Sequence, residues 1–153
     1  MVEQLDNELI LSLGSNLGNR KQNLKNCISH ISKQIGNVLF ESNVYENPAQ
    51  GFESKNDFLN ACIKVKTELK AFEVLSQIQD IEKKMGRIRK TNSYEDRIID
   101  IDIILLNNEL IETKKLTIPH KKYRERIFVL KPLLEIGNYL DPQLFLTTEE
   151  LLR

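Results

Sequence analysis

The stretch Ile98–Leu106 constrains the fold more than any other part of the sequence. Seven of its nine residues are aliphatic, and the two exceptions, Asp100 and Asp102, lie two positions apart. Residues two apart in a β-strand project from the same face, with Cα atoms roughly 6.5–7 Å apart. The sequence therefore predicts a central, well-buried strand that carries both carboxylates on one side.

An acidic pair of this kind needs a compensating group. Two carboxylates about 4 Å apart repel by roughly 4 kcal/mol at an effective dielectric constant of 20. A proton, an arginine or a metal ion can offset that repulsion. Magnesium prefers carboxylate, water and phosphate oxygens, and paired metal ions in phosphoryl-transfer sites lie about 3.5–4 Å apart. The alternative is a solvated pair on an edge strand, because Asp-x-Asp is a short pattern.

Basic residues flank the acidic pair on both sides. They are Arg87, Arg89, Lys90, Arg97, His120, Lys121, Arg124 and Arg126. The chain has 22 Lys plus Arg against 22 Asp plus Glu, so this clustering is local and disfavours a general nucleic-acid binder. Such a pattern is expected around a metal-bound polyphosphate, with arginines on the phosphate oxygens. Ordinary surface charge is the alternative interpretation.

Hydrophobic periodicity predicts the remaining elements. Strands are expected at 8–13, 38–46, 58–65 and 98–106, with helices from Asn19 to Gly36 and from about 70 to Gly86. This β-α-β-β-α-β order is that of a ferredoxin-like fold of the α+β class, in which both helices pack on one sheet face. A C-terminal extension from residue 107, with short helices near 121–125 and 147–152, would complete a three-layer-like α/β/α arrangement. One domain, 1–153, is expected.

Other function classes are disfavoured by what the sequence lacks. The longest purely apolar run near the most hydrophobic stretch of the chain is Ile103–Leu106, which is far shorter than the roughly 20 residues of a membrane-spanning helix. The N-terminus has no signal-peptide features, and Cys27 and Cys62 have no CxxC spacing, which favours the cytoplasm. The segment Gly14–Gly18 lacks the Gly-Lys-Ser/Thr ending of a phosphate-binding loop.

An ordered set of motifs resembles the 6-hydroxymethyl-7,8-dihydropterin pyrophosphokinase family of the folate pathway. The matching segments are Leu13–Arg20, Tyr45–Pro48, Phe58–Ala61, Glu82–Lys90, Arg97–Ile103, Leu116–His120 and Arg126–Leu133. Each motif is modest, whereas the ordered set is specific and spans nearly the whole chain. The resemblance implies a ferredoxin-like fold and a reaction in which the pterin alcohol attacks the β-phosphorus of ATP, giving AMP and the pterin diphosphate.

The same resemblance implies the site. Asp100 and Asp102 match residues that hold two magnesium ions, and Arg87 and Arg97 match catalytic-loop arginines. Positions matching ATP contacts are Gln79, Arg89, Ile103, Lys115, Thr117, His120, Lys121 and Arg126. Positions matching the pterin pocket are Asn47, Pro48, Gln50, Phe58, Asn60, Tyr94 and Phe128. ATP and 6-hydroxymethyl-7,8-dihydropterin are the expected partners of a monomer that binds neither nucleic acid nor membrane.

The chain departs from the family pattern in three places. The family often has Trp-Gly-Pro-Arg where this chain has Tyr94-Glu95-Asp96-Arg97, which places two extra negative charges near the phosphates. Lys121 replaces an aromatic residue that sometimes follows the motif histidine, and Lys115 replaces an arginine seen in some members. Two alternatives stay open: another two-metal nucleotidyl- or phosphotransferase, and a ferredoxin-like RNA-binding module. The identity of the product, AMP or ADP, separates the first from the pyrophosphokinase.

Overall fold

A five-stranded antiparallel sheet forms the centre of the molecule. The computed structural model describes residues 6–87 and 95–153. The strands are β1 (Asn7–Ser15), β2 (Asn37–Glu41), β3 (Tyr45–Asn47), β4 (Phe58–Thr67) and β5 (Asp100–Leu106). They are arranged in the order β2-β4-β1-β5, with β3 also paired to β4, and every pairing is antiparallel. The mixed α/β character and the antiparallel sheet agree with the sequence prediction.

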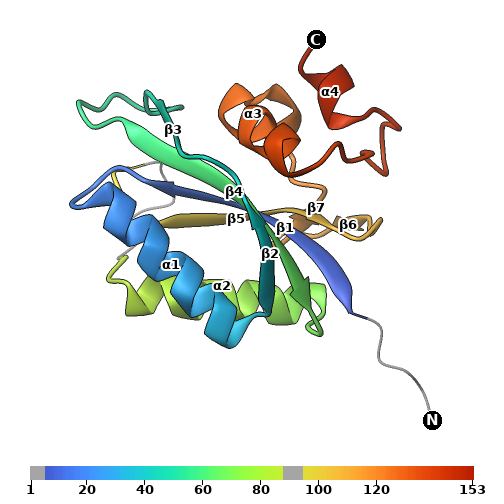
Figure 1. The fold of residues 1–153 in the computed structure, drawn as a ribbon, viewed down its shortest axis with the longest axis horizontal. Helices are drawn as coiled ribbons and strands as arrows, with labels where there is room; N and C mark the ends of the chain where they lie inside the picture. The colour runs from blue at the N-terminus through green and yellow to red at the C-terminus, as the bar shows by residue number, and fades with distance from the viewer. Residues whose placement is uncertain (1–5, 88–94) are drawn as a thin grey trace.

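Two long helices pack on one face of this sheet (Figure 1). Helix α1 (Arg20–Gln34) begins where the Asn19 side chain accepts a hydrogen bond from the backbone N–H of Gln22 at 3.2 Å. Helix α2 (Ala71–Lys84) is followed by Gly86, whose φ of +89° suits a residue without a Cβ. Both helices bury the apolar stripe that the periodicity predicts.

The opposite face of the sheet is covered by the C-terminal segment (Figure 1). The covering elements are a 3-10 turn η1 (Tyr123–Glu125), α3 (Ile127–Ile136) and α4 (Thr148–Leu151). The small sheet of β6 (Ile111–Glu112) and β7 (Thr117–Ile118) instead packs against the core on the α1–α2 side. Alternating residues of β1 serve the two cores, with Leu9 and Leu11 on the α1–α2 side and Ile10 on the α3 side. Helix α3 was not predicted, because its residues are apolar nearly all round and Pro132 lies inside it.

Two predicted strand features are wrong. The strand expected at 38–46 is divided into β2 and β3, because Ser42 bonds to both backbone groups of Cys62: its N–H donates to the carbonyl and its hydroxyl accepts from the N–H, each at 2.9 Å. The strand 98–106 was expected to be central, yet β5 lies at the edge of the sheet. It is nevertheless buried, because α2 and the segment before η1 cover it.

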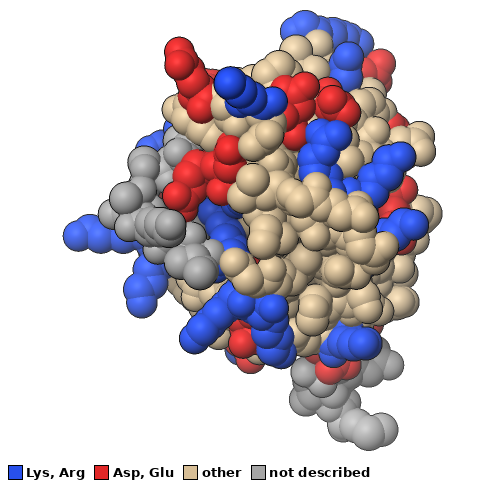
Figure 2. Space-filling model, turned by 90° about the vertical axis from the view of Figure 1, so that its left-hand side faces the viewer, with Lys and Arg blue, Asp and Glu red and all other residues tan. Residues whose placement is uncertain are grey.

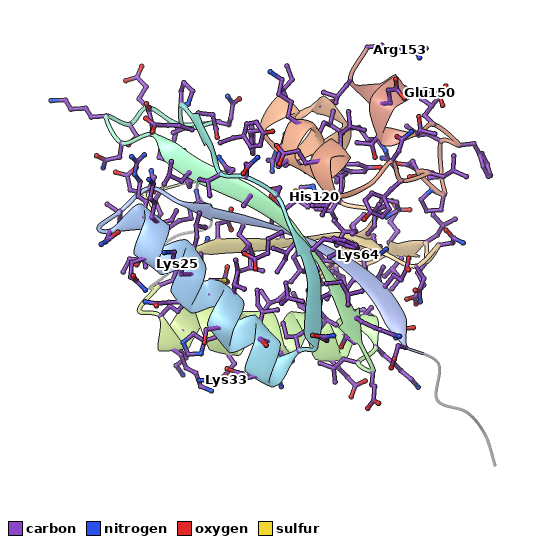
Figure 3. The ribbon with its side chains drawn as sticks, viewed as in Figure 1. Lys25, Lys33, Lys64, His120, Glu150 and Arg153 are labelled. Carbon is purple, nitrogen blue, oxygen red and sulfur yellow. The ribbon has the colours of Figure 1, made fainter. Side chains whose placement is uncertain are left out.

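Charged groups of both signs are mixed on the face of the molecule seen in Figure 2. Figure 2 turns the left-hand side of Figure 1 toward the viewer and shows Lys and Arg interspersed with Asp and Glu. Lys25 and Lys33 project outward from α1, whereas His120 lies between the sheet and the α3–α4 segment (Figure 3). Among the described residues, the helices are all too short or too polar to cross a bilayer.

Candidate active site

Asp100 and Asp102 lie on the same side of β5, facing away from the α1–α2 core. The alternate residues Ile101 and Ile103 are buried in that core. On the neighbouring strand β1, Gly14 is paired with Asp100 and Ser12 is paired with Asp102. Both carboxylates are partly accessible, with side-chain exposures of 26% and 33%. The strand is at an edge, but the pair is not simply solvated, because both aspartates face basic groups.

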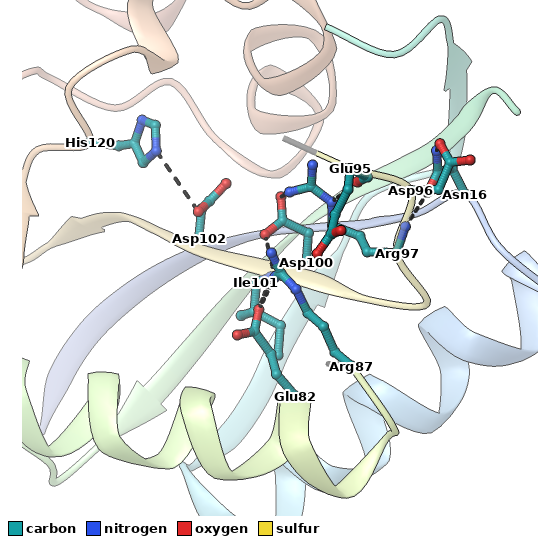
Figure 4. Close-up of polar contacts among 10 residues, drawn as sticks. All are labelled: Asn16, Glu82, Arg87, Glu95, Asp96, Arg97, Asp100, Ile101, Asp102 and His120. Carbon is teal, nitrogen blue, oxygen red and sulfur yellow. Dashed lines mark hydrogen bonds and ion pairs between the residues drawn. The ribbon is translucent and has the colours of Figure 1, made fainter. Parts of the chain in front are cut away.

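Asp100 is neutralised by two arginines (Figure 4). Arg87 Nη1 donates to Asp100 Oδ1 at 2.9 Å, and Arg97 Nη1 lies 3.5 Å from Asp100 Oδ2. Both arginine side chains are only 8% exposed. Charge-assisted bonds in such a position are stronger than those at the surface. Arginine therefore offsets the repulsion between the two aspartates in this state of the protein.

Glu82 supports this arrangement from α2. Its Oε2 accepts a hydrogen bond from Arg87 Nη1 at 2.6 Å and another from the backbone N–H of Ile101 at 3.1 Å. The second bond satisfies an N–H at the outer edge of β5, where no further strand follows. Glu82 was not among the predicted site residues. The signal was present, because an acidic residue occupies a position on the buried face of α2 beside Ile78 and Ile81.

His120 lies on the other side of Asp102. Its Nε2 is 3.9 Å from Asp102 Oδ1 (Figure 4). Burial, and next the positive charge of Arg126, lower the pKa of His120 to about 4, so the ring is neutral at pH 7. The backbone N–H of Lys122 donates to Nδ1 at 3.1 Å, which places the ring proton on Nε2, facing the aspartate. His120 can therefore donate a hydrogen bond into the site without adding a charge.

Asp102 is electrostatically unfavourable as an isolated carboxylate. Burial raises its pKa, and the negative charge of Asp100 raises that pKa further. A carboxylate in such surroundings gains from a nearby cation. Perturbed groups of this kind are typical of functional sites.

Two clefts meet at Asp102. The larger, of about 590 Å³, lies between α2, β5 and the segment 115–121. It brings together the described residues that were predicted to bind ATP, apart from Arg126: Gln79, Ile103, Lys115, Thr117, His120 and Lys121. The smaller, of about 50 Å³, is lined by five residues predicted for the pterin: Asn47, Gln50, Phe58, Asn60 and Phe128. Arg97, Asp100 and Arg126 also line the smaller cleft, and Asp102 lines both.

The smaller cleft is partly filled by an arginine. The guanidinium carbon of Arg97 lies 5.6 Å from the ring centroid of Phe58 and 5.8 Å from that of Phe52. Phe52 was not predicted as a site residue, although an aromatic side chain in the loop 48–57 was a visible signal. Asn60 Nδ2 donates to Asn47 Oδ1. A Cβ on Gly14 would lie 2.9 Å from Asn60 Oδ1, so glycine leaves room for that amide.

Among the described residues that were predicted for the site, Pro48 is not brought into these clefts. Arg89 and Tyr94 lie outside the described residues. Pro48 is exposed and lines neither cleft. The predicted catalytic groups Arg87, Arg97, Asp100 and Asp102 are all close together, as Figure 4 shows.

The family profile for 7,8-dihydro-6-hydroxymethylpterin-pyrophosphokinase (HPPK) matches residues 10–138. The chain belongs to the HPPK family. This confirms the resemblance inferred from the motifs. HPPK enzymes transfer the pyrophosphoryl group of ATP to hydroxymethyldihydropterin in folate biosynthesis.

Individual HPPK proteins resemble the chain over most of its length. The 2-amino-4-hydroxy-6-hydroxymethyldihydropteridine pyrophosphokinase of Bacillus subtilis is 38% identical over 140 residues, covering 91% of this chain and 83% of the relative. The protein of the same name from Porphyromonas gingivalis is 39% identical, with coverages of 87% and 92%.

The fold also resembles solved HPPK structures. A crystal structure of HPPK-DHPS in complex with substrates superposes with a TM-score of 0.77 at 14% sequence identity. The superposition covers 96% of this chain but only 43% of the longer HPPK-DHPS chain. At that identity the likeness concerns the fold alone, and the chain corresponds to less than half of the solved protein.

Proposed function

We propose that this chain transfers diphosphate from ATP to the hydroxymethyl group of 6-hydroxymethyl-7,8-dihydropterin through the two clefts that meet at Asp102. The larger cleft takes ATP and the smaller takes the pterin. The observation that carries this assignment is that Asp102 lines both clefts. A triphosphate entering from the larger cleft then reaches the pterin alcohol beside the acidic pair. The alcohol loses its proton to water as its oxygen bonds to the β-phosphorus, the bond from that phosphorus to the α–β bridging oxygen breaks, and AMP leaves with the bridging oxygen.

The proposed cofactors are two magnesium ions held by Asp100 and Asp102. The donor atoms are carboxylate oxygens, and no group of three or more His, Cys, Asp or Glu in the described residues can enclose a metal without other ligands. Such a site suits an ion that keeps water and phosphate oxygens in its coordination shell. When bound, the ions supply positive charge to the phosphate oxygens that become more negative during transfer.

The basic residues of the chain act on the phosphates. Arg87 and Arg97 form ion pairs with Asp100, close to where the phosphate tail would lie. Each guanidinium can exchange the aspartate for phosphate oxygens, which offer the same kind of acceptor. His120 donates its Nε2 proton as a neutral group. These groups stabilise negative charge where it develops, which is the main requirement of phosphoryl transfer.

The smaller cleft supplies orientation for the pterin. Phe58 and Phe128 offer aromatic surfaces to a flat heterocycle, and Asn60 and Asn47 offer amide groups to its polar edge. Arg97 lies against the Phe58 ring, so a pterin that stacks on Phe58 from that side requires the Arg97 side chain to move. That movement would carry a positive charge from the pterin cleft toward the phosphates.

Several finer features belong to the same proposal. The sheet order β2-β4-β1-β5, with α1 and α2 on one face and α3 on the other, supports a ferredoxin-like core in a three-layer-like α/β/α arrangement. We further propose a single domain over 1–153 that acts as a monomer in the cytoplasm, without nucleic-acid or membrane partners. These remain predictions.

The decisive experiment identifies the nucleotide product. The purified protein is incubated with ATP, magnesium and 6-hydroxymethyl-7,8-dihydropterin, and the nucleotides are separated by ion-exchange chromatography. We expect AMP in a 1:1 ratio to the pterin diphosphate, with no AMP when the pterin is omitted. Formation of ADP would contradict diphosphate transfer and support an ordinary phosphotransferase.

A further inference from the structure

The carboxylate of Asp96, the residue before Arg97, is hydrogen-bonded to the loop 48–57 and to Asn16 after β1, beside the smaller cleft. Asp96 Oδ1 accepts hydrogen bonds from Ser54 Oγ at 2.5 Å and from Asn16 Nδ2 at 2.7 Å. Asp96 Oδ2 accepts from Asn56 Nδ2 at 2.9 Å. Ser54 and Asn56 belong to the loop 48–57 between β3 and β4, whereas Asn16 follows β1. We call Asp96 with Asn16, Ser54 and Asn56 the Asp96 clamp.

Asn16 fixes the backbone on which the clamp depends. Its Oδ1 accepts from the backbone N–H of Arg97 at 2.7 Å, and its own N–H donates to the Arg97 carbonyl at 3.0 Å. Asn16 is only 2% exposed. One buried amide therefore holds the main chain of Arg97 and, through Nδ2, the side chain of Asp96. The Arg97 side chain is left to reach Asp100 on one side and the Phe58 ring on another.

The loop that Asp96 holds forms part of the smaller cleft. Gln50 and Phe52 line that cleft, and Ser54 and Asn56 follow them in the same loop. Phe52 also packs edge-to-face against Phe58, with ring centroids 6.4 Å apart. Through the Asp96 clamp, the loop that forms one wall of the cleft is hydrogen-bonded to Asp96, the residue immediately before Arg97. Two of these hydrogen bonds, from Ser54 and Asn56, join Asp96 to the loop 48–57, and the third joins it to Asn16.

The donors of the clamp suit an ionised carboxylate best. An ionised carboxylate accepts several hydrogen bonds and donates none, which matches the Ser54, Asn16 and Asn56 donors. These hydrogen bonds, the one from Ser54 being the largest contribution, hold the pKa of Asp96 below its ordinary value. Asp96 was expected to add negative charge near the phosphates. Its hydrogen bonds come from neutral donors, namely Ser54 and Asn56 of the loop 48–57 and Asn16 after β1.

We propose that Asp96 is a positioning residue for the transfer reaction, acting through the loop 48–57 and Arg97 and not by touching either substrate. This inference rests on the proposed assignment of the smaller cleft to the pterin. With the clamp formed, the Phe52 wall and the Arg97 main chain are fixed relative to each other before the pterin binds. Without it, pterin binding must order both, which weakens binding and misplaces Arg97 for the transfer step.

The test compares Asp96→Ala, Asp96→Asn and Ser54→Ala in steady-state kinetics with both substrates. For Asp96→Ala we expect the KM for the pterin to rise about tenfold and kcat to fall about tenfold, since each bond to a charged group contributes appreciably. The Kd for a non-hydrolysable ATP analogue stays within about twofold, because none of the clamp residues lines the larger cleft. Asp96→Asn retains part of the wild-type kinetics, and Ser54→Ala adds nothing further in the Asp96→Ala background.

The control is Glu53→Ala, which removes an exposed negative charge from the same loop and should leave all constants unchanged. Unchanged kinetics in Asp96→Ala, equal losses for ATP and pterin, or additive effects of the two clamp substitutions would overturn the proposal. Hydrogen exchange of residues 52–57 gives an independent readout that needs no turnover. Faster exchange in Asp96→Ala supports the clamp, and unchanged exchange refutes it, even if the wild-type protein forms no AMP. Should Asp96→Ala not fold, Ser54→Ala and Asn56→Ala carry the same kinetic and exchange tests.

Discussion

Arg87 donates to Asp100 through the same Nη1 atom that donates to Glu82. The distances are 2.9 Å to Asp100 Oδ1 and 2.6 Å to Glu82 Oε2. Glu82 therefore helps to fix the position of the Arg87 guanidinium beside Asp100. Its side chain is 6% exposed, so the carboxylate cannot be replaced by water without rearrangement.

Glu82→Ala is expected to impair both stability and catalysis. The substitution leaves Arg87 with one partner fewer and the Ile101 N–H without its acceptor, so the free energy of unfolding should fall by about 3 kcal/mol. Urea unfolding measures this value. We expect Glu82→Gln to recover part of the stability, because its amide oxygen can still accept from Ile101, but to keep a lowered kcat. A wild-type kcat in Glu82→Gln would show that Arg87 needs no negative partner on α2.

Asp102→Asn is expected to separate stability from activity. Burial and the charge of Asp100 raise the pKa of Asp102, so the ionised side chain destabilises the free protein. The neutral amide has almost the same shape and removes that repulsion. We expect turnover to be lost while the Tm of the ligand-free protein stays the same or rises. Differential scanning fluorimetry and the AMP assay measure the two effects, and Asp6→Asn near the N-terminus is a control. Near-normal turnover would remove Asp102 from the metal site.

The neutrality of His120 predicts a specific pH dependence. The pKa of His120 is lowered from 6.5 to about 4 in the folded protein. Between pH 6.5 and 4, His120 is therefore protonated in the unfolded chain but neutral in the folded protein. The contribution of neutral His120 to the stability of the folded protein is present above pH 6.5 and is lost as the pH falls toward 4. We expect the free energy of unfolding to fall between these values, and this fall to be smaller in His120→Asn. Urea titrations at a series of pH values provide the comparison. An identical slope in both proteins would contradict a neutral His120.

The sequence predicted those parts of the site that depend on local spacing. The shared face of Asp100 and Asp102 follows from the two-residue period of a strand, and the loop with Asn47 and Gln50 follows from its motif. It did not predict that β5 is an edge strand, because burial on both faces is supplied by elements far along the chain. The apolar run looks central, yet its outer N–H at Ile101 is satisfied by a side chain, Glu82.

Long-range polar contacts were equally inaccessible from the sequence. Asp96 is separated from Asn16 by 80 positions and from Ser54 by 42, so no periodicity links them. Only the departure from the family pattern drew attention to Asp96, and that departure indicated extra charge near the phosphates. The fold instead gives the charge three neutral partners. Motifs therefore indicated the candidate site residues, whereas the contacts that position those residues could be seen only in the tertiary structure.

Asp141 provides a last prediction, concerning the C-terminal segment that covers the α3 face of the sheet. The residue is completely buried, and it accepts from the Tyr123 hydroxyl at 2.6 Å and from Arg124 Nε at 2.7 Å. The backbone N–H groups of Gln143 and Leu144 also donate to it, each at 2.9 Å. Burial alone would raise its pKa, but the bonds from Arg124 and Tyr123 dominate and hold the pKa at about 2.

Asp141→Ala should therefore destabilise the protein by about 3 kcal/mol, because Tyr123 and Arg124 lose a buried anionic partner. Chemical unfolding at pH 7 measures the loss, and Glu149→Ala, an exposed acidic change on α4, should have almost no effect. The depressed pKa of Asp141 means that its contribution is complete above pH 3.8 and disappears as the pH falls through about 2. Because Asp141 lines neither cleft, the folded variant should keep its KM for ATP. A stable variant would show that the C-terminal segment is held by its apolar contacts alone.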